Sequence, residues 1–175
     1  IKEIRVSIEG LANAVVDHDL SESIVYSYTW LSKFDEETPP APLSSSLLWS
    51  PGQGIRLTGI PASVDTTRID RKRIYRSQTS ASGATDLYFV AEIANNVTVF
   101  DDSPDNVPVQ EPIQSLDYDP PLPDMIGLVS MPNGMMAAFR GRTLCFSEPY
   151  RPHAWPEKYR LRTDFTIVGL ATAGD

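Results

Sequence analysis

Two places in the 175-residue sequence combine residue types that could catalyse a reaction. Asp17, His18 and Asp19 follow one another, and carboxylates beside an imidazole could orient a general base or bind a metal ion. Cys145 and His153 could supply a thiol nucleophile and its base. The sequence supplies neither a reacting partner nor a third group for either pair. We predict that the first three residues form a polar connection before a strand, and that Cys145 is a buried, inert side chain.

The acidic middle of the chain imitates part of a calcium-binding loop. Asp101, Ser103 and Asp105 carry side-chain oxygens at alternate positions, as an EF-hand does. The sixth position is Asn106 instead of glycine and the twelfth is Pro112 instead of glutamate, which leaves only a looser cation site as an alternative. Glycine-rich phosphate loops and the HExxH and GxSxG motifs are absent. We predict no enzymatic activity, no catalytic residue, no metal site and no cofactor.

Residues 149–156 have the composition of a contact loop. Three prolines bracket this stretch and prevent a regular helix or a central strand. The side chains between them include types that dominate the energetics of protein interfaces. We predict partner contacts through Tyr150, Arg151, His153 and Trp155. The alternative is that Trp155 folds back as local core under a small sheet, and both hold if the loop locks two domains together.

The negative charge of the chain lies mainly in one segment. The formal net charge is −8, and residues 101–124 hold 7 of the 23 acidic residues and no basic one. Six of the 15 prolines lie in the same segment, which predicts an extended linker. An acidic segment disfavours nucleic-acid binding, which depends on Lys and Arg at phosphates. We interpret the basic cluster within residues 68–76 as solvent-facing positions around one strand.

Composition and pattern predict an all-β protein. The chain is 41% apolar and has one cysteine, which excludes a disulfide scaffold and a zinc finger. No apolar run approaches the roughly 18 residues of a membrane span. Only residues 7–20 are compatible with a helix, and Gly10 interrupts them. Alternating and β-branched segments predict strands at Ile24–Leu31, Ile55–Ile60, Ile69–Arg76, Leu87–Ile93, Asn96–Phe100, Met125–Ser130, Met135–Phe139, Thr143–Ser147 and Phe165–Leu170.

The strand pattern divides the chain into three parts. We predict that residues 1–100 form a β-sandwich, residues 101–124 form the acidic linker, and residues 125–175 form a β-meander that is part of a second domain. The pair Asn133-Gly134 predicts a hairpin in this meander, because both residues tolerate positive φ. Three strands are at the lower limit of independent stability, so we expect the meander to pack on another element.

Several strand segments resemble known families. The middle strands of a fibronectin type III module are similar to Arg73–Ser77, Tyr88–Ile93 and Thr98–Asp102, and its last two strands to Val25–Trp30 and Glu36–Pro42. The order of these segments is reversed, which implies a permuted sandwich or a chain cut between tandem modules. The resemblance implies an immunoglobulin-like or fibronectin type III-like sandwich, a fold that hosts many functions.

The C-terminal part resembles a family of tailed-bacteriophage and prophage virion structural proteins. The resemblance lies in Met131–Phe139, Leu144–Pro156 and Ile167–Ala171. In that family, such a segment resembles the first blade of a larger, propeller-like β domain that follows a fibronectin-like module. The resemblance implies a non-enzymatic structural component of the phage tail or neck, assembled into the virion in the bacterial host cytoplasm.

The partners that the resemblance implies are proteins. They are other virion proteins and further copies of the chain, with no nucleic acid and no membrane. The alternative is a tail adhesin or a module that recognises a carbohydrate or receptor on the host surface. An exposed aromatic platform of Trp155, Tyr150 and Trp30 would favour the adhesin, whereas burial of these rings would favour the structural role.

Overall fold

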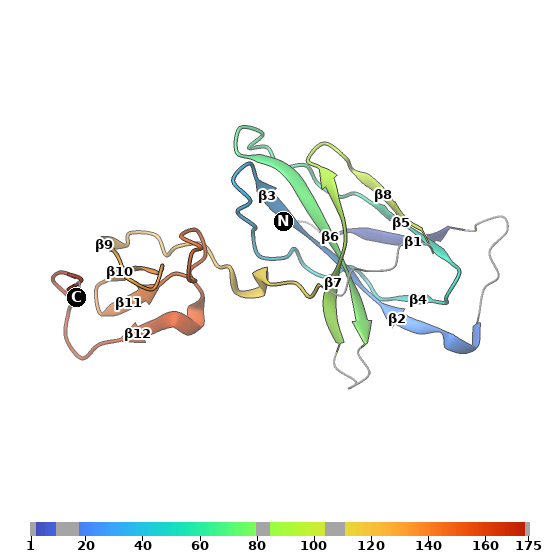
Figure 1. Ribbon diagram of the computed structural model, residues 1–175. Helices are drawn as coiled ribbons and strands as arrows, with labels where there is room; N and C mark the ends of the chain where they lie inside the picture. The colour runs from blue at the N-terminus through green and yellow to red at the C-terminus, as the bar shows by residue number, and fades with distance from the viewer. Residues whose placement is uncertain (1–2, 10–17, 80–84, 104–110, 174–175) are drawn as a thin grey trace. The chain divides into compact units, whose positions relative to one another are not determined.

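The computed structural model of the chain describes residues 3–9, 18–79, 85–103 and 111–173 (Figure 1). Strands dominate these residues, and their helical elements are the short 3-10 turns His18–Leu20, Ser115–Asp117 and Glu157–Tyr159. The prediction of an all-β protein is therefore confirmed. The chain forms two compact units, Ile1–Gln114 and Ser115–Asp175.

The first unit is a β-sandwich. Its strands are β1 (Arg5–Glu9), β2 (Glu22–Ile24), β3 (Tyr26–Ser32), β4 (Leu47–Trp49), β5 (Gly54–Thr58), β6 (Ile69–Thr79), β7 (Thr85–Ala94) and β8 (Val99–Asp102). One sheet has the order β1-β5-β8, the other has the order β3-β6-β7, and β2 pairs with β4. Every pair is antiparallel, and Figure 1 shows the two three-stranded sheets as separate layers.

The sandwich core follows from the two-residue period of its strands. Tyr26, Tyr28 and Trp30 alternate along β3 and face the other sheet, where Ile55 and Leu57 of β5 are almost fully buried. Burying each such side chain contributes roughly 1.5–3 kcal/mol. Four of the predicted strands correspond to β3, β5, β6 and β7. The strand predicted at Asn96–Phe100 begins only at Val99, because residues 95 and 96 form a turn, and it continues to Asp102 as β8. The structure adds β1, β2 and β4.

The start of the chain differs from its helix-compatible pattern. Arg5–Glu9 form β1, which pairs along its full length with β5, from Arg5 opposite Thr58 to Glu9 opposite Gly54. Val6 and Ile8 alternate with polar residues, and a partner strand stabilises this pattern better than an isolated helical turn. The rest of the helix-compatible stretch, residues 10–17, lies outside the described residues.

Proline-containing segments cover both edges of the β3-β6-β7 sheet. Along β3, the backbone N–H groups of Thr38, Ala41 and Ser44 donate to the carbonyls of Trp30, Tyr28 and Tyr26. Prolines 39, 40 and 42 therefore occupy positions between the donating residues, where a missing N–H costs nothing.

The other edge of the sheet is covered in the same way. The N–H of Phe89 on β7 donates to the Glu111 carbonyl, and the N–H of Ile113 donates to the Leu87 carbonyl. Pro112 lies between these two positions and forms an isolated bridge opposite Tyr88. The segment 111–113, predicted as linker, thus pairs with β7 through an isolated bridge.

The predicted linker also begins inside a strand. Asp101 and Asp102 belong to β8, opposite Arg56 and Ile55 of β5. Their carboxylates pair with basic side chains of other strands, Asp101 with Arg56 of β5 and Asp102 with Arg76 of β6 in the other sheet. Acidity alone therefore misplaced the boundary. Residues 104–110 lie outside the described residues.

The second unit contains a four-stranded antiparallel meander. Its strands are β9 (Ile126–Ser130), β10 (Met136–Arg140), β11 (Thr143–Phe146) and β12 (Arg160–Arg162), in the order β12-β11-β10-β9. The predicted turn joins β9 to β10, where Gly134 has φ +75°. The structure adds β12 to the three predicted strands.

The strand predicted at Phe165–Leu170 is absent from the structure. This segment has no regular secondary structure, although the Ile167 N–H donates to the Gly141 carbonyl. Phe165 and Val168 are 84% and 97% exposed. Its alternating pattern meets no neighbouring strand among the described residues, so it forms no ladder.

Candidate interaction site

The described residues with catalytic potential do not form an open reaction centre. The Nδ1 atom of His18 lies 3.5 Å from the hydroxyl of Ser50, which in turn lies 2.8 Å from the Ser21 hydroxyl. Ser50 is only 4% exposed, so a substrate could not reach its oxygen without rearrangement. Asp17 lies outside the described residues. The part of the chain that the structure describes has no group of three His, Cys, Asp or Glu placed to hold a metal ion.

Cys145 is buried, as predicted. Its side chain on β11 packs with Ala138 and Trp155 in the core of the second unit. Burial raises the pKa of the thiol above its ordinary value, which reduces the thiolate fraction. His153 places its ring edge-on to Tyr118, with the ring centroids 5.8 Å apart.

The basic cluster on β6 is only partly solvent-facing, which corrects the prediction. The two-residue period points Lys72 and Arg76 inward beside Ile74, where Lys72 is fully buried and Arg76 is 9% exposed. The Lys72 amine donates to the carbonyls of Pro61 and Val97. Burial lowers the pKa of Lys72 to about 8. Lys72 therefore ties the loops that contain Pro61 and Val97 to β6.

A buried polar cluster joins the two sheets of the sandwich. Asp102 of β8 accepts hydrogen bonds from the Tyr26 hydroxyl at 2.6 Å and from the Arg76 guanidinium at 2.8 Å. The same guanidinium lies over the Trp49 ring, 5.4 Å from its centroid. Burial, and next the Asp102 carboxylate, raise the pKa of Tyr26. The cluster is closed to solvent and holds the layers in register.

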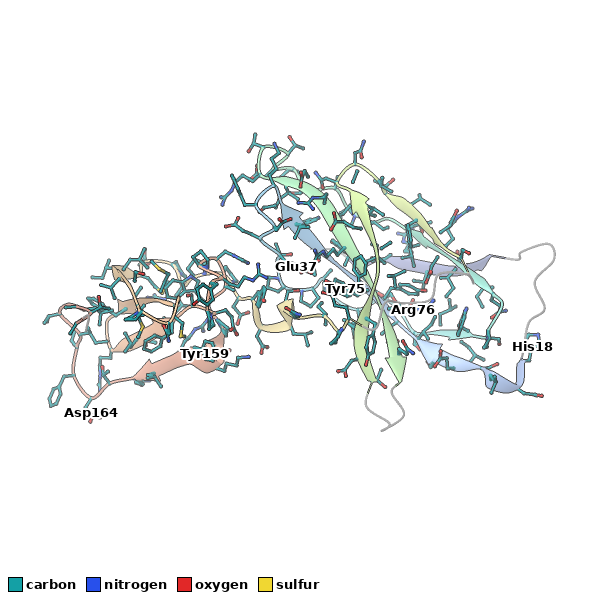
Figure 2. All side chains as sticks on the ribbon, in the orientation of Figure 1. His18, Glu37, Tyr75, Arg76, Tyr159 and Asp164 are labelled. Carbon is teal, nitrogen blue, oxygen red and sulfur yellow. The ribbon has the colours of Figure 1, made fainter. Side chains whose placement is uncertain are left out.

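A second polar cluster fixes the proline-containing edge to β3 and β6. Glu37 accepts hydrogen bonds from the hydroxyls of Thr29 and Tyr75 at 2.7 and 2.6 Å, and it pairs with Arg73 at 3.2 Å. Figure 2 shows Glu37 and Tyr75 close together on the sheet. Burial, and next the hydrogen bond to Glu37, raise the pKa of Tyr75. These groups satisfy one another and form no reaction centre.

The predicted contact loop splits into a buried and an exposed part. Trp155 is 4% exposed, and its indole N–H donates to the Pro152 carbonyl at 2.9 Å. Its backbone N–H donates to the Asp119 carbonyl at 2.7 Å. Tyr150 is 80% exposed, and Arg151 is exposed beside it. Trp155 therefore belongs to the local core, whereas the contact role of the four residues stays a prediction.

Hydrogen bonds hold this loop in one shape. The Glu148 N–H donates to the Ala154 carbonyl and closes the loop, while the Tyr150 N–H donates to the Gly134 carbonyl. Tyr150 itself has φ +58°. A Cβ at Gly134 would lie 2.5 Å from the Tyr150 ring, so this turn requires glycine for its space as well as its φ.

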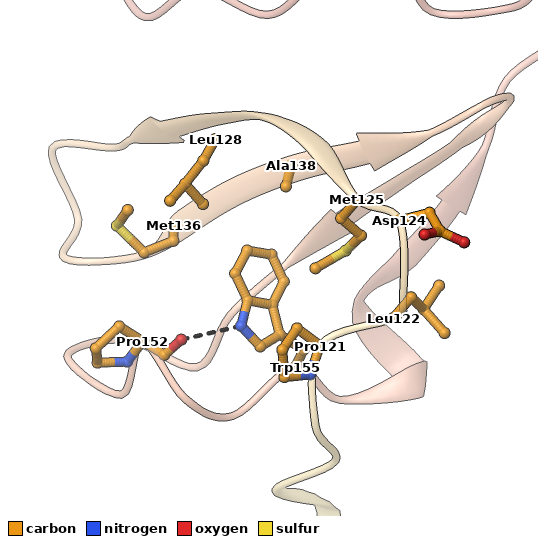
Figure 3. Close-up of a pocket in the computed structure, with 9 residues that line it drawn as sticks. All are labelled: Pro121, Leu122, Asp124, Met125, Leu128, Met136, Ala138, Pro152 and Trp155. Carbon is orange, nitrogen blue, oxygen red and sulfur yellow. Dashed lines mark hydrogen bonds between the residues drawn. The ribbon is translucent and has the colours of Figure 1, made fainter.

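A hollow of about 400 Å³ lies beside the Trp155 ring (Figure 3). It is within the size range of about 300–1,000 Å³ that is common for ligand pockets. Eight of its nine lining residues are apolar, and the ninth is an aspartate. They are Pro121, Leu122, Asp124, Met125, Leu128, Met136, Ala138, Pro152 and Trp155.

The other face of the four-stranded sheet carries an apolar row. The register places one apolar residue of each strand side by side, namely Ile126, Phe139, Leu144 and Leu161. Ala138 and Cys145 face Trp155, so their strand neighbours Phe139 and Leu144 point to the opposite face. Phe139 is 3% exposed, whereas Ile126 and Leu161 are 61% and 56% exposed. We call these four residues the apolar row.

The apolar row could not be seen in the sequence. Leu161 belongs to β12, a three-residue strand between two arginines that shows too little alternation to be recognised. The position of Ile126 depends on a register shift in the β9–β10 pair, between Ala137 and Phe139. The sequence showed only that the apolar segment Met125–Ser130 ends before a turn. This pattern does not indicate which face of the sheet Ile126 occupies.

No protein-family model matches the sequence, and no curated protein matches it. Among the described residues, no helix is long and apolar enough to cross a membrane.

Proposed function

We propose that the chain is a non-enzymatic structural component of a phage or prophage particle, in its tail or neck, that acts through protein contacts. The resemblance of the C-terminal part to virion structural proteins supports the proposal that the chain is part of a phage particle. The geometry of the second unit supports the contact role. The observation that carries this role is the apolar row, whose ends Ile126 and Leu161 are more than half exposed.

The meander has more apolar surface than its own unit covers. One face packs on Trp155, while the opposite face adds Val129, Ala137 and Phe146 to the apolar row. A sheet that is apolar on both faces is typical of a layer between two others. Covering the exposed part contributes about 25 cal/mol for each Å² of apolar surface removed from water. A partner protein that supplies a sheet or an apolar face would do this.

The face of the sheet is a better contact surface than its edges. At one edge, β12 carries Arg160 and Arg162, and charged side chains discourage a further strand. At the other edge, the register shift and the positive φ of Gly127 distort β9. A bulge of this kind interrupts the regular row of backbone groups that strand addition needs. The contact therefore involves side chains of the face.

The geometry gives no support to an adhesin built on an aromatic platform. Trp155 is buried, and Trp30 packs against the sandwich core with its indole N–H directed to the Pro61 carbonyl. Stacking on a sugar requires an exposed ring face. Tyr150 alone among the three predicted rings is largely exposed.

The first experiment tests whether the protein is a component of a phage particle. Particles from the cells that produce this protein are purified by density gradient and analysed by mass spectrometry and by immunogold electron microscopy. We expect the protein in the particle fraction, with gold at the tail or neck. Its absence from purified particles, or labelling elsewhere, would contradict the proposal.

The second experiment tests the contact surface. The double variant Ile126→Lys, Leu161→Lys places charges on exposed side chains, so the fold is retained while the face becomes polar. We expect self-association of the wild type, measured by light scattering across a concentration series, and a monomer for the variant. Val64→Lys is the matched control, because Val64 is fully exposed in the first unit. Equal association of the wild type and the double variant would contradict this surface.

A further inference from the structure

We propose that the hollow beside Trp155 binds a peptide segment of a partner protein in which a lysine or arginine is flanked by apolar residues. This inference rests on the proposed contact role and names the partner's chemistry. The hollow lies on the face opposite the apolar row, so it is a separate surface of the same unit.

The wall of the hollow offers apolar contact and few polar groups. The Trp155 N–H is already used by the Pro152 carbonyl, so the indole presents ring surface to an occupant. Met125 and Met136 lie beside the ring, as Figure 3 shows, and methionine side chains adapt to different apolar shapes. Leu128, 61% exposed, lies at the same hollow. Such a wall fits the aliphatic stem of a side chain.

Asp124 supplies the one charge of the lining. Its side chain is exposed, and its backbone has φ +62°. Three other carboxylates of this unit have basic partners: Asp117 and Glu148 pair with Lys158, and Glu157 with Arg160. The ion pairs formed among the described residues do not include Asp124. The charge complementary to the hollow is therefore positive.

Lysine and arginine match this combination of wall and charge. Their aliphatic stems lie along apolar surface while the charged end stays in water, here next to Asp124. A volume of about 400 Å³ exceeds one such side chain, so apolar neighbours of the basic residue fill the remainder. An anionic ligand would meet the repulsion of the carboxylate.

The test uses three tripeptides that differ only in the central residue. Acetylated and amidated Leu-Lys-Leu, Leu-norleucine-Leu and Leu-Glu-Leu are titrated into the full chain, and the Trp155 indole N–H is followed by NMR. The indole signals of Trp30 and Trp49, in the first unit, are internal controls. We expect the lysine peptide to bind about two- to fivefold more tightly than the norleucine peptide, the range of an exposed ion pair. The glutamate peptide is expected to bind most weakly.

Two variants isolate the effect of the Asp124 carboxylate, and a third tests the apolar wall of the hollow. Asp124→Asn keeps a residue type that tolerates positive φ, and we expect it to bind the lysine and norleucine peptides equally. Asp164→Asn, an exposed carboxylate of the same unit outside the hollow, should keep the preference. Leu128→Lys, at an exposed lining position, should weaken binding of the lysine peptide most.

The possible results separate this inference from the proposed function. Absence of Trp155 shifts with every peptide, or equal binding of the lysine and norleucine peptides to the wild type, would overturn the peptide site. Loss of self-association in the Ile126 and Leu161 variant would still support the contact role in that case. A lysine preference that survives in Asp124→Asn would also overturn the assignment.

Discussion

At the scale of single residues, the most constrained group is the buried carboxylate of Asp102. It brings β8 of one sheet to Tyr26 and Arg76 of the other, with its side chain shielded from water. Hydrogen bonds to a charged, buried acceptor are worth more than neutral ones, and breaking one side of a buried pair leaves the other charge uncompensated. The cluster therefore makes pairing between the two layers specific.

Asp102→Asn tests this cluster. The variant keeps the size of the side chain but leaves the Arg76 guanidinium buried without a carboxylate, so we expect a loss of about 3–5 kcal/mol in the free energy of unfolding. Tyr26→Phe is the control, because the ion pair remains and one hydrogen bond is lost, at a cost of roughly 1 kcal/mol. Urea denaturation measures both. Equal losses would show that the ion pair adds nothing.

Because the Lys72 amine is buried, the free energy of unfolding depends on pH in the alkaline range. Its pKa is about 8 in the folded chain and about 10.5 in the unfolded chain, so the unfolded chain binds more protons between these values. The contribution of Lys72 to stability therefore rises as the pH increases from about 8 to about 10.5. Tyr26 and Tyr75 have the opposite effect above about pH 10, because their pKa values are raised in the folded state.

The difference between the wild type and Lys72→Met isolates the lysine, since both chains contain the same tyrosines. We expect the free energy of unfolding of the wild type, relative to the variant, to increase between pH 8 and pH 10. Urea midpoints at intervals of pH measure this difference. A constant difference would mean that the amine keeps its ordinary pKa in the folded chain.

At the scale of elements, prolines decide where the β3-β6-β7 sheet ends. Along the 38–44 segment every third N–H reaches β3, a repeat that is typical of polyproline II, and the prolines occupy positions between the donors. The sequence could not predict that residues 111–113 form the equivalent rim on β7, because their acidic, proline-rich surroundings suggest a linker.

Ala41→Pro tests the rim. The change removes the N–H that donates to the Tyr28 carbonyl at 2.8 Å and leaves that buried acceptor without this bond, so we expect a loss of roughly 1–3 kcal/mol. Leu43→Pro is the matched control at a 52% exposed position between the donors, and should change stability little. Thermal unfolding followed by circular dichroism measures both. Similar losses would contradict the spacing argument.

Strand length explains which elements the sequence could predict. Segments such as Ile69–Arg76 and Leu87–Ile93 show several alternations and were located, whereas β4 and β12 have three residues each and were missed. Phe165–Leu170 shows the reverse case, an alternation with no neighbouring strand in the structure. Side-chain alternation is a local property, but a strand also needs a partner.

The same limit applies to the candidate site. The sequence placed Trp155 in a rigid, proline-bracketed loop and left open whether it formed a contact or a core. Its burial depends on the hydrogen bonds to Asp119 and Pro152, which are 36 and 3 residues away, and the first of these contacts is set by the fold. The hollow and the apolar row need the register of four strands, which composition does not specify.

At the scale of the whole chain, the two units differ in how completely they cover their own apolar surface. Ile1–Gln114 has a two-sheet core and two buried polar clusters of its own. Ser115–Asp175 has a smaller core around Trp155 and a second apolar face. A unit of about 60 residues buries a smaller fraction of its surface and is marginally stable.

We therefore expect the two units to behave differently when expressed separately. Residues 1–114 should give a well-dispersed amide NMR spectrum and a cooperative thermal transition, because their stabilising contacts are internal. Residues 115–175 should melt at a lower temperature than the first unit and associate more readily. The full chain is the control for both. A stable, monomeric second unit would contradict the view that its outer face requires a partner.

The covered edges of the β3-β6-β7 sheet prevent strand addition between copies of the chain that lie close together. An open edge recruits the same strand of the next molecule, and a particle that holds many copies side by side would turn this tendency into uncontrolled polymerisation. The segments around Pro40 and Pro112 insulate this sheet from its neighbours. Under the proposed function, crowded copies would then join through the second unit without strand addition at this sheet.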